Sequence, residues 1–350
     1  MSAGPTADLA RLVDLVESFS RQEILLLGDF VADEFVFGDI SRVSREAPVL
    51  ILRHRETECV PGGGANAANN LADLGARVFP VAALGEDAPG DALTAYFKSK
   101  RVDTSGLVRV RDWRTPTKTR FLAGWTHTAR QQVLRMDYEP AGPPPERASD
   151  LIVRKIRDRL PSASAMLVSD YGYGSATPAS LQAAPAKKRV ALPVTLDSRY
   201  RLHEYAGLGL AAATPNEAEL EAAHHEEIGG KLAKLESLAQ RTMKRLGLRS
   251  LVVTRGRDGM TVFERGHSPH SLPVFGSDQA LDVTGAGDTV IAVFTLAIAA
   301  GATATEAAQL ANYAGGIVVM KRGTATVTRE ELLAAIRADA TGGDGPGDHA

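Results

Sequence analysis

The chain has 350 residues, of which 44% are hydrophobic, and a formal net charge of −2 at pH 7. These values suit one α/β domain with an appended element, and they give no sign of binding to nucleic acid or to an anionic membrane. The single cysteine, Cys59, excludes an internal disulfide and a cysteine-based metal site. The chain shows no signal-peptide pattern, and its longest apolar run, Val290 to Ala300, is about half of what spans a bilayer. We therefore expect a cytoplasmic protein.

The first elements in chain order are a helix and a buried strand. Apolar residues recur at helical spacing from Leu9 to Phe19. The wholly apolar run Ile24 to Leu27 predicts a strand buried on both faces, ending at Gly28. Asp29 and Asp33 follow at the carboxyl end of this strand, where ligands bind in open α/β sheets. Asp33 could accept hydrogen bonds from sugar hydroxyls, and a loop cap is the alternative for either aspartate.

Four strand-like segments do not fit a strand–helix alternation. They span Phe35 to Ile40, Val49 to Arg55, Thr117 to Ala123 and Gln132 to Met136. We expect them to form a small antiparallel sheet, built from about residues 34–56 and 115–137, that serves as a lid over the site. Three cations, Lys118, Arg120 and Arg135, lie on these strands. They could bind a substrate anion, or they could be solvated charges on an exposed strand.

The rest of the chain alternates between strands and helices. The run Gly62-Gly63-Gly64-Ala65-Asn66 opens a helix that reaches about Leu74, and its glycines would let the backbone approach a ligand closely. Further strands are expected at 77–84, 166–169, 190–196, 210–214, 250–254 and 260–264, and further helices at 88–99, 146–160, 177–187, 231–246, 305–320 and 328–337. This alternation predicts a mainly parallel sheet with helices on both faces. We expect one domain over residues 1–340 and a disordered Gly-rich tail over 341–350.

The segment Asp282 to Gly301 carries the strongest chemical signal. A turn at Gly285, Ala286 and Gly287 precedes Asp288, and the residues from Thr289 onward predict a buried helix. Backbone N–H groups at such a turn can bind an anion, with the positive end of the helix dipole behind them. A carboxylate there would repel phosphate, so Asp288 needs a compensating use. The obvious use is to accept the proton of an attacking hydroxyl during phosphoryl transfer, and a simple helix cap is the alternative.

The two glycine motifs, with Asn216-x-x-Glu219 between them, resemble the ribokinase-like (PfkB) family of carbohydrate kinases. The run DVTGAGDT from Asp282 matches the C-terminal signature of that family, and GGGANAANNLADLG from Gly62 matches its N-terminal signature. The resemblance covers about residues 22 to 338. It implies a three-layer α/β sandwich with a mainly parallel central sheet and a β-sheet lid. It also implies ATP and Mg²⁺ as cofactors, with a monovalent cation possible.

The resemblance assigns roles to individual residues. For catalysis it indicates Asp288 as the base and Gly285, Ala286 and Gly287 as the anion hole. For the cofactor it indicates Thr254, Gly256, Gly259, Asp282, Thr284 and Asn312, together with Asn216 and Glu219, which would organise Mg²⁺ through water. For the substrate it indicates Asp29, Asp33, Gly63, Gly64, Asn66, Lys118, Arg120, Arg135 and Asp170.

Within this family the chain is most similar to the kinases of ADP-heptose synthesis, which phosphorylate D-glycero-D-manno-heptose 7-phosphate at O1. The likeness rests on the segments 28–33, 41–49, 117–120, 134–137, 168–171 and 282–291. Two positions depart from that pattern, because Tyr173 stands where a lysine is expected and Asp197-Ser198-Arg199 stands in place of Asp-Pro-Lys. No nucleotidyltransferase module is found, so we expect any adenylylation to need another protein.

Other functions are compatible with parts of this pattern. The chain could phosphorylate another sugar or a nucleoside, or it could be a non-catalytic sugar or nucleotide sensor on the same fold. A sensor would have no need of a carboxylate at position 288 beside the phosphates. A dehydrogenase is disfavoured because GDFVADE, after the first strand, lacks the glycines that a dinucleotide requires. Because a small isolated sheet leaves its edges open, we also expect a homodimer formed through the lid.

Overall fold

The computed structural model describes residues 8–124, 130–183, 192–276 and 280–340. The tail 341–350 and the end of the helix predicted over 177–187 lie outside the described residues. A nine-stranded sheet with the order β13-β12-β11-β10-β9-β8-β1-β4-β5 forms the centre of the molecule. Its strands are β1 (Glu23–Gly28), β4 (Arg77–Gly85), β5 (Leu107–Val110), β8 (Ala165–Asp170), β9 (Val194–Ser198), β10 (Ala212–Ala213), β11 (Ser250–Thr254), β12 (Met260–Glu264) and β13 (His270–Leu272). The strands from β5 to β11 pair in parallel, whereas β12 and β13 are antiparallel additions at one edge.

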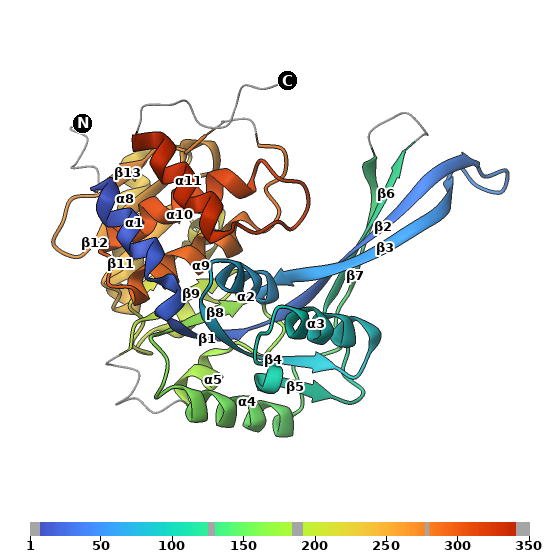
Figure 1. Cartoon of the computed structure of the whole chain (residues 1–350), viewed down its shortest axis with the longest axis horizontal. Coiled ribbons are helices and arrows are strands. Elements are labelled where there is room, and N and C mark those ends of the chain that lie inside the picture. The colour runs from blue at the N-terminus through green and yellow to red at the C-terminus, as the bar shows by residue number, and fades with distance from the viewer. Residues whose placement is uncertain (1–7, 125–129, 184–191, 277–279, 341–350) are drawn as a thin grey trace.

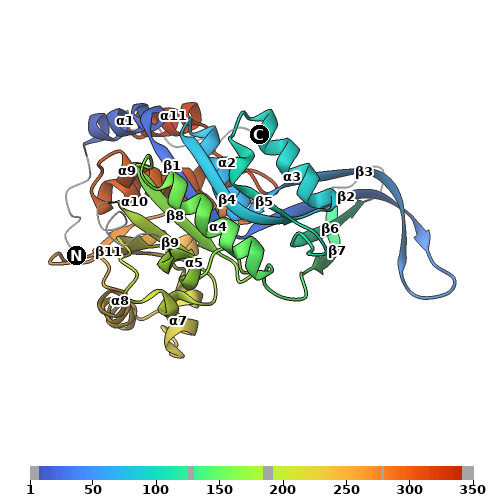
Figure 2. The same ribbon diagram turned by 90° about the horizontal axis from the view of Figure 1, so that it is seen from below.

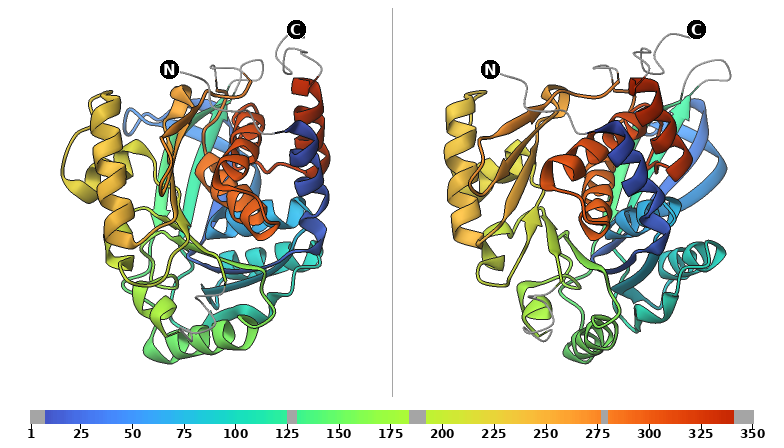
Figure 3. Two further views of the ribbon diagram at one scale, coloured as in Figure 1. Left: turned by 90° about the vertical axis from the view of Figure 1, so that its left-hand side faces the viewer. Right: turned by 60° about the vertical axis from the view of Figure 1, so that its left-hand side comes forward.

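Helices cover both faces of this sheet, which gives the three layers that the sequence predicts (Figure 3). One face carries α1 (Leu9–Glu17), α2 (Gly64–Asp73), α3 (Ala88–Ser99), α9 (Ala286–Ala299), α10 (Ala304–Val318) and α11 (Arg329–Ala340). The other carries α4 (Glu146–Arg159), α5 (Pro178–Gln182), α7 (Glu217–His224) and α8 (Leu232–Leu246). The first and last helices, α1 and α11, pack side by side and bring the two ends of the described chain together. None of the described helices is long and apolar enough to cross a membrane.

Strand β1 shows why an apolar run predicts a strand that is buried on both faces. Ile24 and Leu26 pack into the core on the α2 and α9 side, while Leu25 and Leu27 pack into the core on the α4 side. All four side chains are buried, because successive side chains of a strand point to opposite faces of the sheet. A continuous apolar run is therefore what a strand covered on both faces requires.

The second sheet is the lid, and it projects away from the body of the molecule (Figures 1 and 2). Its strands β2 (Phe30–Val43), β3 (Leu50–Gly63), β6 (Thr117–Gly124) and β7 (Gln131–Tyr138) lie in the order β3-β2-β6-β7. The expectation of a wholly antiparallel sheet was wrong, because β2 and β6 pair in parallel. Between these two strands the chain passes through α2, β4, α3 and β5 of the body, and this crossover returns it to the lid in the same direction.

Several elements differ from the sequence-based boundaries in ways that matter for the site. The short strands β5 and β13 were not predicted, because a run of three or four residues carries little periodic signal. Strand β2 begins at Phe30, so Asp33 lies inside a lid strand rather than in a loop. Helix α9 begins at Ala286 rather than at Thr289, which places Asp288 in the first helical turn. The charge of that carboxylate therefore lies at the positive end of the helix dipole.

Candidate active site

Asp288 is buried where the first turn of α9 meets α2 and the loop after β8. Its Oδ1 accepts a 2.7 Å hydrogen bond from the hydroxyl of Tyr171, and its Oδ2 accepts a 3.1 Å bond from the amide of Asn66. Burial raises the pKa of the Asp288 carboxyl to about 7, while these two hydrogen bonds oppose the rise. A carboxyl poised near neutral pH is suited to take up a proton during a reaction and release it afterwards.

The two glycine motifs meet at this carboxylate. Asn66, in the first turn of α2, also donates to the backbone oxygen of Gly285 over 3.3 Å. Gly285 caps α9 with φ +78°, and a Cβ atom there would lie 2.5 Å from the Asn66 amide nitrogen. Only glycine fits both the left-handed backbone and this close approach. Asn66 is therefore fixed on Asp288 by the same turn that forms the predicted anion hole.

A cavity of about 520 Å³ opens on one side of this turn. The predicted nucleotide residues Thr254, Gly256, Gly259 and Asn312 all line it, together with Ala286 and Gly287 of the predicted anion hole. The remaining walls are largely apolar, with Met260, Val274, Val283, Val290 and Val319. A nucleotide fits this shape, with its flat base against the apolar walls and its phosphates directed at the start of α9.

Four residues assigned to the cofactor, Asn216, Glu219, Asp282 and Thr284, do not line this cavity. Asp282 accepts hydrogen bonds of 2.9 Å from the backbone N–H groups of Thr284 and Gly323. These bonds hold the pKa of the Asp282 carboxyl below its usual value. Asp282 and Thr284 thus shape the turn before Gly285, and the structure brings neither of them to the cavity wall.

Asn216 and Glu219 form a capping box at the start of α7. The Asn216 side chain accepts from the N–H of Glu219 over 2.8 Å, and a Glu219 carboxylate oxygen accepts from the N–H of Asn216 over 2.9 Å. The other oxygen of Glu219 remains available for a ligand. Asp197 lies at the end of β9, close to Glu219. Burial and the charge of Glu219 raise the pKa of the Asp197 carboxyl well above its usual value.

A second cavity of about 770 Å³ lies under the lid. Its walls carry Lys118 and Arg135 of the lid strands, Tyr171 and Tyr173 of the loop after β8, and Arg199, Tyr200 and Arg201 after β9. Arg135 is neutralised by a two-bond contact with Asp137, at 2.8 and 2.6 Å. In the described part of the chain, neither Lys118 nor Arg199 forms an ion pair with a carboxylate.

Asp33 and Arg120 pair with each other instead of standing free for a substrate. Arg120 donates to Asp33 Oδ1 over 2.7 Å, and the Thr324 hydroxyl donates to Asp33 Oδ2 over 2.9 Å. The Arg120 side chain is 12% exposed and that of Asp33 is 5% exposed. Gly62 is required beside them, since a Cβ atom at that position would lie 2.4 Å from Asp33 Oδ2. The Asp33 carboxylate can still accept a hydrogen bond from a sugar hydroxyl. The charge of Arg120, however, is already compensated by Asp33.

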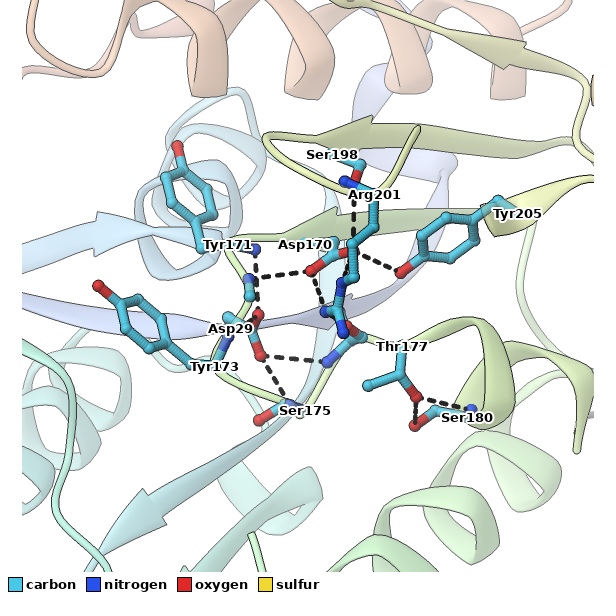
Figure 4. Close-up of polar contacts among 12 residues, drawn as sticks. Asp29, Asp170, Tyr171, Tyr173, Ser175, Thr177, Ser180, Ser198, Arg201 and Tyr205 are labelled. Atoms are coloured by element: carbon cyan, nitrogen blue, oxygen red, sulfur yellow. Dashed lines mark hydrogen bonds and ion pairs between the residues drawn. The ribbon is translucent and has the colours of Figure 1, made fainter. Parts of the chain in front are cut away.

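Asp29 has a bracing role that differs from the substrate contact expected for it. Its two oxygens accept from four backbone N–H groups of the loop after β8, those of Tyr171, Tyr173, Ser175 and Ala176, at 2.7 to 3.2 Å (Figure 4). Burial and the nearby charge of Asp170 raise the pKa of Asp29 to about 6, against the effect of these bonds. The contact matches the alternative role predicted from the sequence, in which Asp29 caps a loop.

Asp170 is likewise occupied by the protein. Arg201 forms a two-bond ion pair with it, Tyr205 donates over 2.9 Å, and Ser198 donates over 3.1 Å (Figure 4). The carboxylate is buried, so these donors compensate the loss of water. The structure therefore places Asp170 behind the loop that bears Tyr171, away from the second cavity.

The glycines assigned to the substrate act through the backbone. Gly63 has φ +54°, and a Cβ atom there would lie 3.4 Å from the Tyr171 ring. Gly64 is buried against β1, and its N–H donates to the backbone oxygen of Asp29 over 3.0 Å. Both residues let α2 start close to β1, and this closeness carries Asn66 to Asp288.

Sequence reasoning gave no role to Tyr171, Asp197 or Arg199. Tyr171 belongs to the segment 168–171 that carries the family likeness, and Asp197 and Arg199 belong to a departure from the family pattern. The departure Asp197-Ser198-Arg199 keeps a cation at this strand end, because Arg199 places a guanidinium at the wall of the second cavity. Tyr171 directly follows β8, and Asp197 and Arg199 lie at the end of β9, so all three come at the same sheet edge as Gly28 and Asp170. This position is the signal that could have indicated them.

Asp288 follows Gly287, which lines the first cavity, and bonds to Tyr171, which lines the second. A buried proton acceptor in this place, beside a helix start, fits a phosphotransferase that acts on a hydroxyl group. The comparisons with known proteins name the class more closely. A model of the pfkB family of carbohydrate kinases matches residues 30–331, and the chain belongs to that family. It is therefore a carbohydrate kinase.

The chain is also similar to individual proteins. It is 36% identical over 329 residues to the bifunctional protein HldE of Desulfatibacillum aliphaticivorans, covering 92% of this chain and 64% of that protein. The HldE of Aeromonas salmonicida is 37% identical over 324 residues, with 91% and 64% covered. The chain thus spans just under two thirds of the length of these relatives.

Solved structures show the same fold. A ribokinase of Arabidopsis thaliana, complexed with ribose and ATP, has a TM-score of 0.67 and 20% identity, with 90% of this chain and 99% of that chain covered. Phosphofructokinase-2 of Escherichia coli, in complex with substrates and products, has a TM-score of 0.69 and 17% identity, with 90% and 98% covered.

Proposed function

We propose that the chain transfers the γ-phosphoryl group of MgATP to a hydroxyl of a sugar that already carries a phosphate. D-glycero-D-manno-heptose 7-phosphate, phosphorylated at O1, is the acceptor proposed. The observation that carries this is that Asp288 follows Gly287, which lines a largely apolar cavity at the start of α9, and bonds to Tyr171, which lines a cation-bearing cavity under the lid. Further support comes from the relatives named HldE, a protein that includes a heptose 7-phosphate kinase domain.

The donor nucleotide is assigned to the 520 Å³ cavity. Its phosphates would lie at the backbone N–H groups of Gly287 and Asp288 in the first turn of α9, because the next one, that of Thr289, already donates to the Gly285 oxygen over 3.1 Å. Arg257 lines the same cavity and offers a cation to the phosphates. The ribokinase of similar fold is complexed with ribose and ATP, which supports ATP as the donor.

In the part of the chain that the structure describes, no three acidic, histidine or cysteine side chains form a group that could hold a metal ion directly. Mg²⁺ prefers oxygen ligands and keeps several waters, so Asn216 and Glu219 would hold it through water. When bound, the ion would neutralise charge that develops on the phosphates.

The reaction then follows from Asp288. The acceptor hydroxyl donates to a lone pair of Asp288 that Tyr171 and Asn66 leave open. As the hydroxyl oxygen bonds to the γ-phosphorus, the bond from that phosphorus to the bridging oxygen of ADP breaks. The proton of the hydroxyl passes to Asp288, which later releases it to solvent.

The acceptor phosphate is assigned to Lys118 and Arg199. Burial lowers the pKa of the Lys118 ammonium, so a phosphate beside it would favour its charged form. Desolvating such cations for a neutral sugar would cost free energy, whereas a phosphate compensates them. Arg199 can form two parallel hydrogen bonds with a phosphate.

An ADP-release assay over a panel of acceptors tests this proposal. The panel contains heptose 7-phosphate, fructose 6-phosphate and the two sugars without phosphate, with the Asp288→Asn variant as the control for background ATP hydrolysis. We expect heptose 7-phosphate to give the highest kcat/KM, about tenfold or more above its unphosphorylated form. ³¹P NMR of the product should show a new phosphate at O1. Equal KM values for phosphorylated and unphosphorylated sugars would reject the sugar-phosphate acceptor.

A further inference from the structure

A hydroxyl outside both glycine motifs touches the proposed base. Tyr171, the first residue after β8, donates to Asp288 Oδ1 over 2.7 Å. In the described chain this is one of two side-chain hydrogen bonds to the carboxylate, and the other comes from Asn66 at Oδ2. Because each donor holds a different oxygen, the two bonds together fix the rotation of the carboxylate plane.

The loop that bears Tyr171 is itself held tightly. Four of its backbone N–H groups bond to the buried carboxylate of Asp29, and a fifth, that of Gly172, bonds to Asp170 over 2.9 Å. Gly172 and Gly174, with φ +86° and +100°, allow the chain to turn around these carboxylates. Figure 4 shows the rings of Tyr171 and Tyr173 projecting on the same side of the loop, away from Arg201. Two buried carboxylates therefore set the place of the Tyr171 ring.

The lid contacts the same ring. The ammonium nitrogen of Lys118, on β6, lies 5.7 Å from the centroid of the Tyr171 ring, within cation–π range. Tyr171 thus joins a lid residue proposed to meet the acceptor phosphate to the carboxylate proposed to take the proton. Its hydroxyl has no other hydrogen-bond partner among the described residues.

We propose that Tyr171 is a positioning residue for Asp288. Its hydroxyl, clamped in place by Asp29, holds Oδ1 so that the remaining lone pairs face the acceptor hydroxyl and the carboxylate stays ionised. The inference rests on the proposed role of Asp288 as the base. Tyr171 itself takes no proton, since burial and the charge of Asp288 raise the pKa of its phenol well above the usual value.

Several charged groups face Asp288 and contribute to its protonation. A hydrogen bond from Tyr171 favours the ionised form, as does the charge of Lys118, whereas the charge of Asp33 opposes it. Asp197 faces it from β9, with Glu219 beyond on α7. Removing the Tyr171 hydroxyl leaves all the other groups in place, so the change in the Asp288 pKa reports this one contact.

Carboxyl ¹³C NMR measures that pKa without any substrate. Aspartate labelled at the side-chain carboxyl gives a titrating signal for Asp288, assigned by its loss in Asp288→Asn. In Tyr171→Phe we expect the pKa to rise by about one unit, because a hydrogen bond to a charged group is lost. Tyr173→Phe is the matched control in the same loop, since its hydroxyl bonds to Glu139 rather than to Asp288, and it should leave the signal unchanged. An Asp288 pKa in Tyr171→Phe equal to that of the wild type would overturn the proposal.

Kinetics on the full chain test the consequence for turnover. For the acceptor identified by the panel, kcat/KM of Tyr171→Phe should fall about tenfold at pH 6 and recover towards the wild-type value at pH 9, with KM for ATP unchanged. Tyr96→Phe, on α3, is the control outside the site. A loss of equal size at every pH would mean a purely structural role and would reject the inference.

A second variant and the separate outcomes for Asp288 and Tyr171 make the test decisive. If Tyr171→Phe does not fold, Tyr171→Met removes the hydroxyl while filling a similar volume, and the same two measurements apply. If Asp288→Asn retains activity, the proposed base is wrong. If Asp288→Asn is inactive but Tyr171→Phe titrates like the wild type, the base stands and the role of Tyr171 fails.

Discussion

Replacing Asp288 by asparagine removes a proton acceptor while keeping the shape of the side chain. Both contacts of the carboxylate come from donors, so the amide can keep one oxygen contact with Tyr171 or Asn66. We expect turnover to fall by about 10²–10⁴-fold, the usual contribution of a general base. ATP binding, measured by calorimetry, should stay close to the wild-type value. Retention of more than about a tenth of the activity would contradict the assignment.

Arg199 gives a residue-scale test of the acceptor charge. It lines the cavity under the lid and, within the described residues, pairs with no carboxylate. Arg199→Ala should raise KM for a phosphorylated sugar by about tenfold, because a charge-assisted hydrogen bond is worth about 1.5–3 kcal/mol, and should leave KM for ATP unchanged. Arg53→Ala, an exposed arginine on β3, is the matched control. An unchanged KM for the phosphorylated sugar would mean that Arg199 does not bind the acceptor phosphate.

At the scale of an element, the short helix η3 (Leu202–Tyr205) predicts a pH dependence of stability. It carries His203, whose Nε2 is buried with no hydrogen-bond partner among the described residues and whose ring lies 4.6 Å from that of His224. Burial, with the charges of His224, Arg245 and Arg241, lowers the pKa of His203 from 6.5 to about 4. Tyr205 at the end of the same element bonds to Asp170, so loosening η3 would also loosen the clamp behind the Tyr171 loop.

The sign of the effect follows from linkage. The unfolded chain binds a proton at His203 more readily than the folded one, so the stabilisation is complete above about pH 6.5 and is lost as the pH falls from there towards 4. His203→Gln stays neutral and should show a shallower fall in melting temperature between pH 7 and pH 4.5. The exposed His267→Gln is the control. Parallel melting curves for wild type and His203→Gln would refute this prediction.

At the scale of the whole molecule, the lid presents apolar residues to solvent. Val43 is 58% exposed, Leu50 43% and Leu134 53%, and every residue of the outer strand β7 is exposed. An uncovered apolar sheet with open edges is unusual for a monomer. We propose that this surface packs against its copy in a homodimer.

Light scattering after size exclusion measures the assembly directly. The wild type at micromolar concentration should have about twice the 37.1 kDa mass of the chain. Leu134→Lys should shift the protein towards the monomer, because it buries a charge in the proposed interface. Leu232→Lys, an exposed apolar position on α8 outside the lid, should leave the mass unchanged. A fully active wild-type monomer would exclude the dimer as a requirement for function.

The sequence by itself determined the class of fold and the second sheet, and it indicated the candidate base. Apolar runs of the kind at Ile24 to Leu27 specify strands covered on both faces, and glycine turns such as Gly285 specify a left-handed backbone at a helix start. These signals are local, since neighbouring residues on the chain decide them. Asp288 and Asn66 were identified in the same way, as parts of short motifs.

Only the tertiary structure decided which polar groups meet. Asp33 and Arg120 lie 87 positions apart, Tyr171 and Asp288 lie 117 apart, and Asp29 reaches a loop more than 140 positions away. Their pairing depends on the parallel register of β2 with β6 and on the order of β1 and β8 in the sheet. A carboxylate in a sequence offers the same acceptors to a sugar, a backbone or an arginine. The fold selects among them, because burial makes an unpaired charge costly and brings one particular donor within reach.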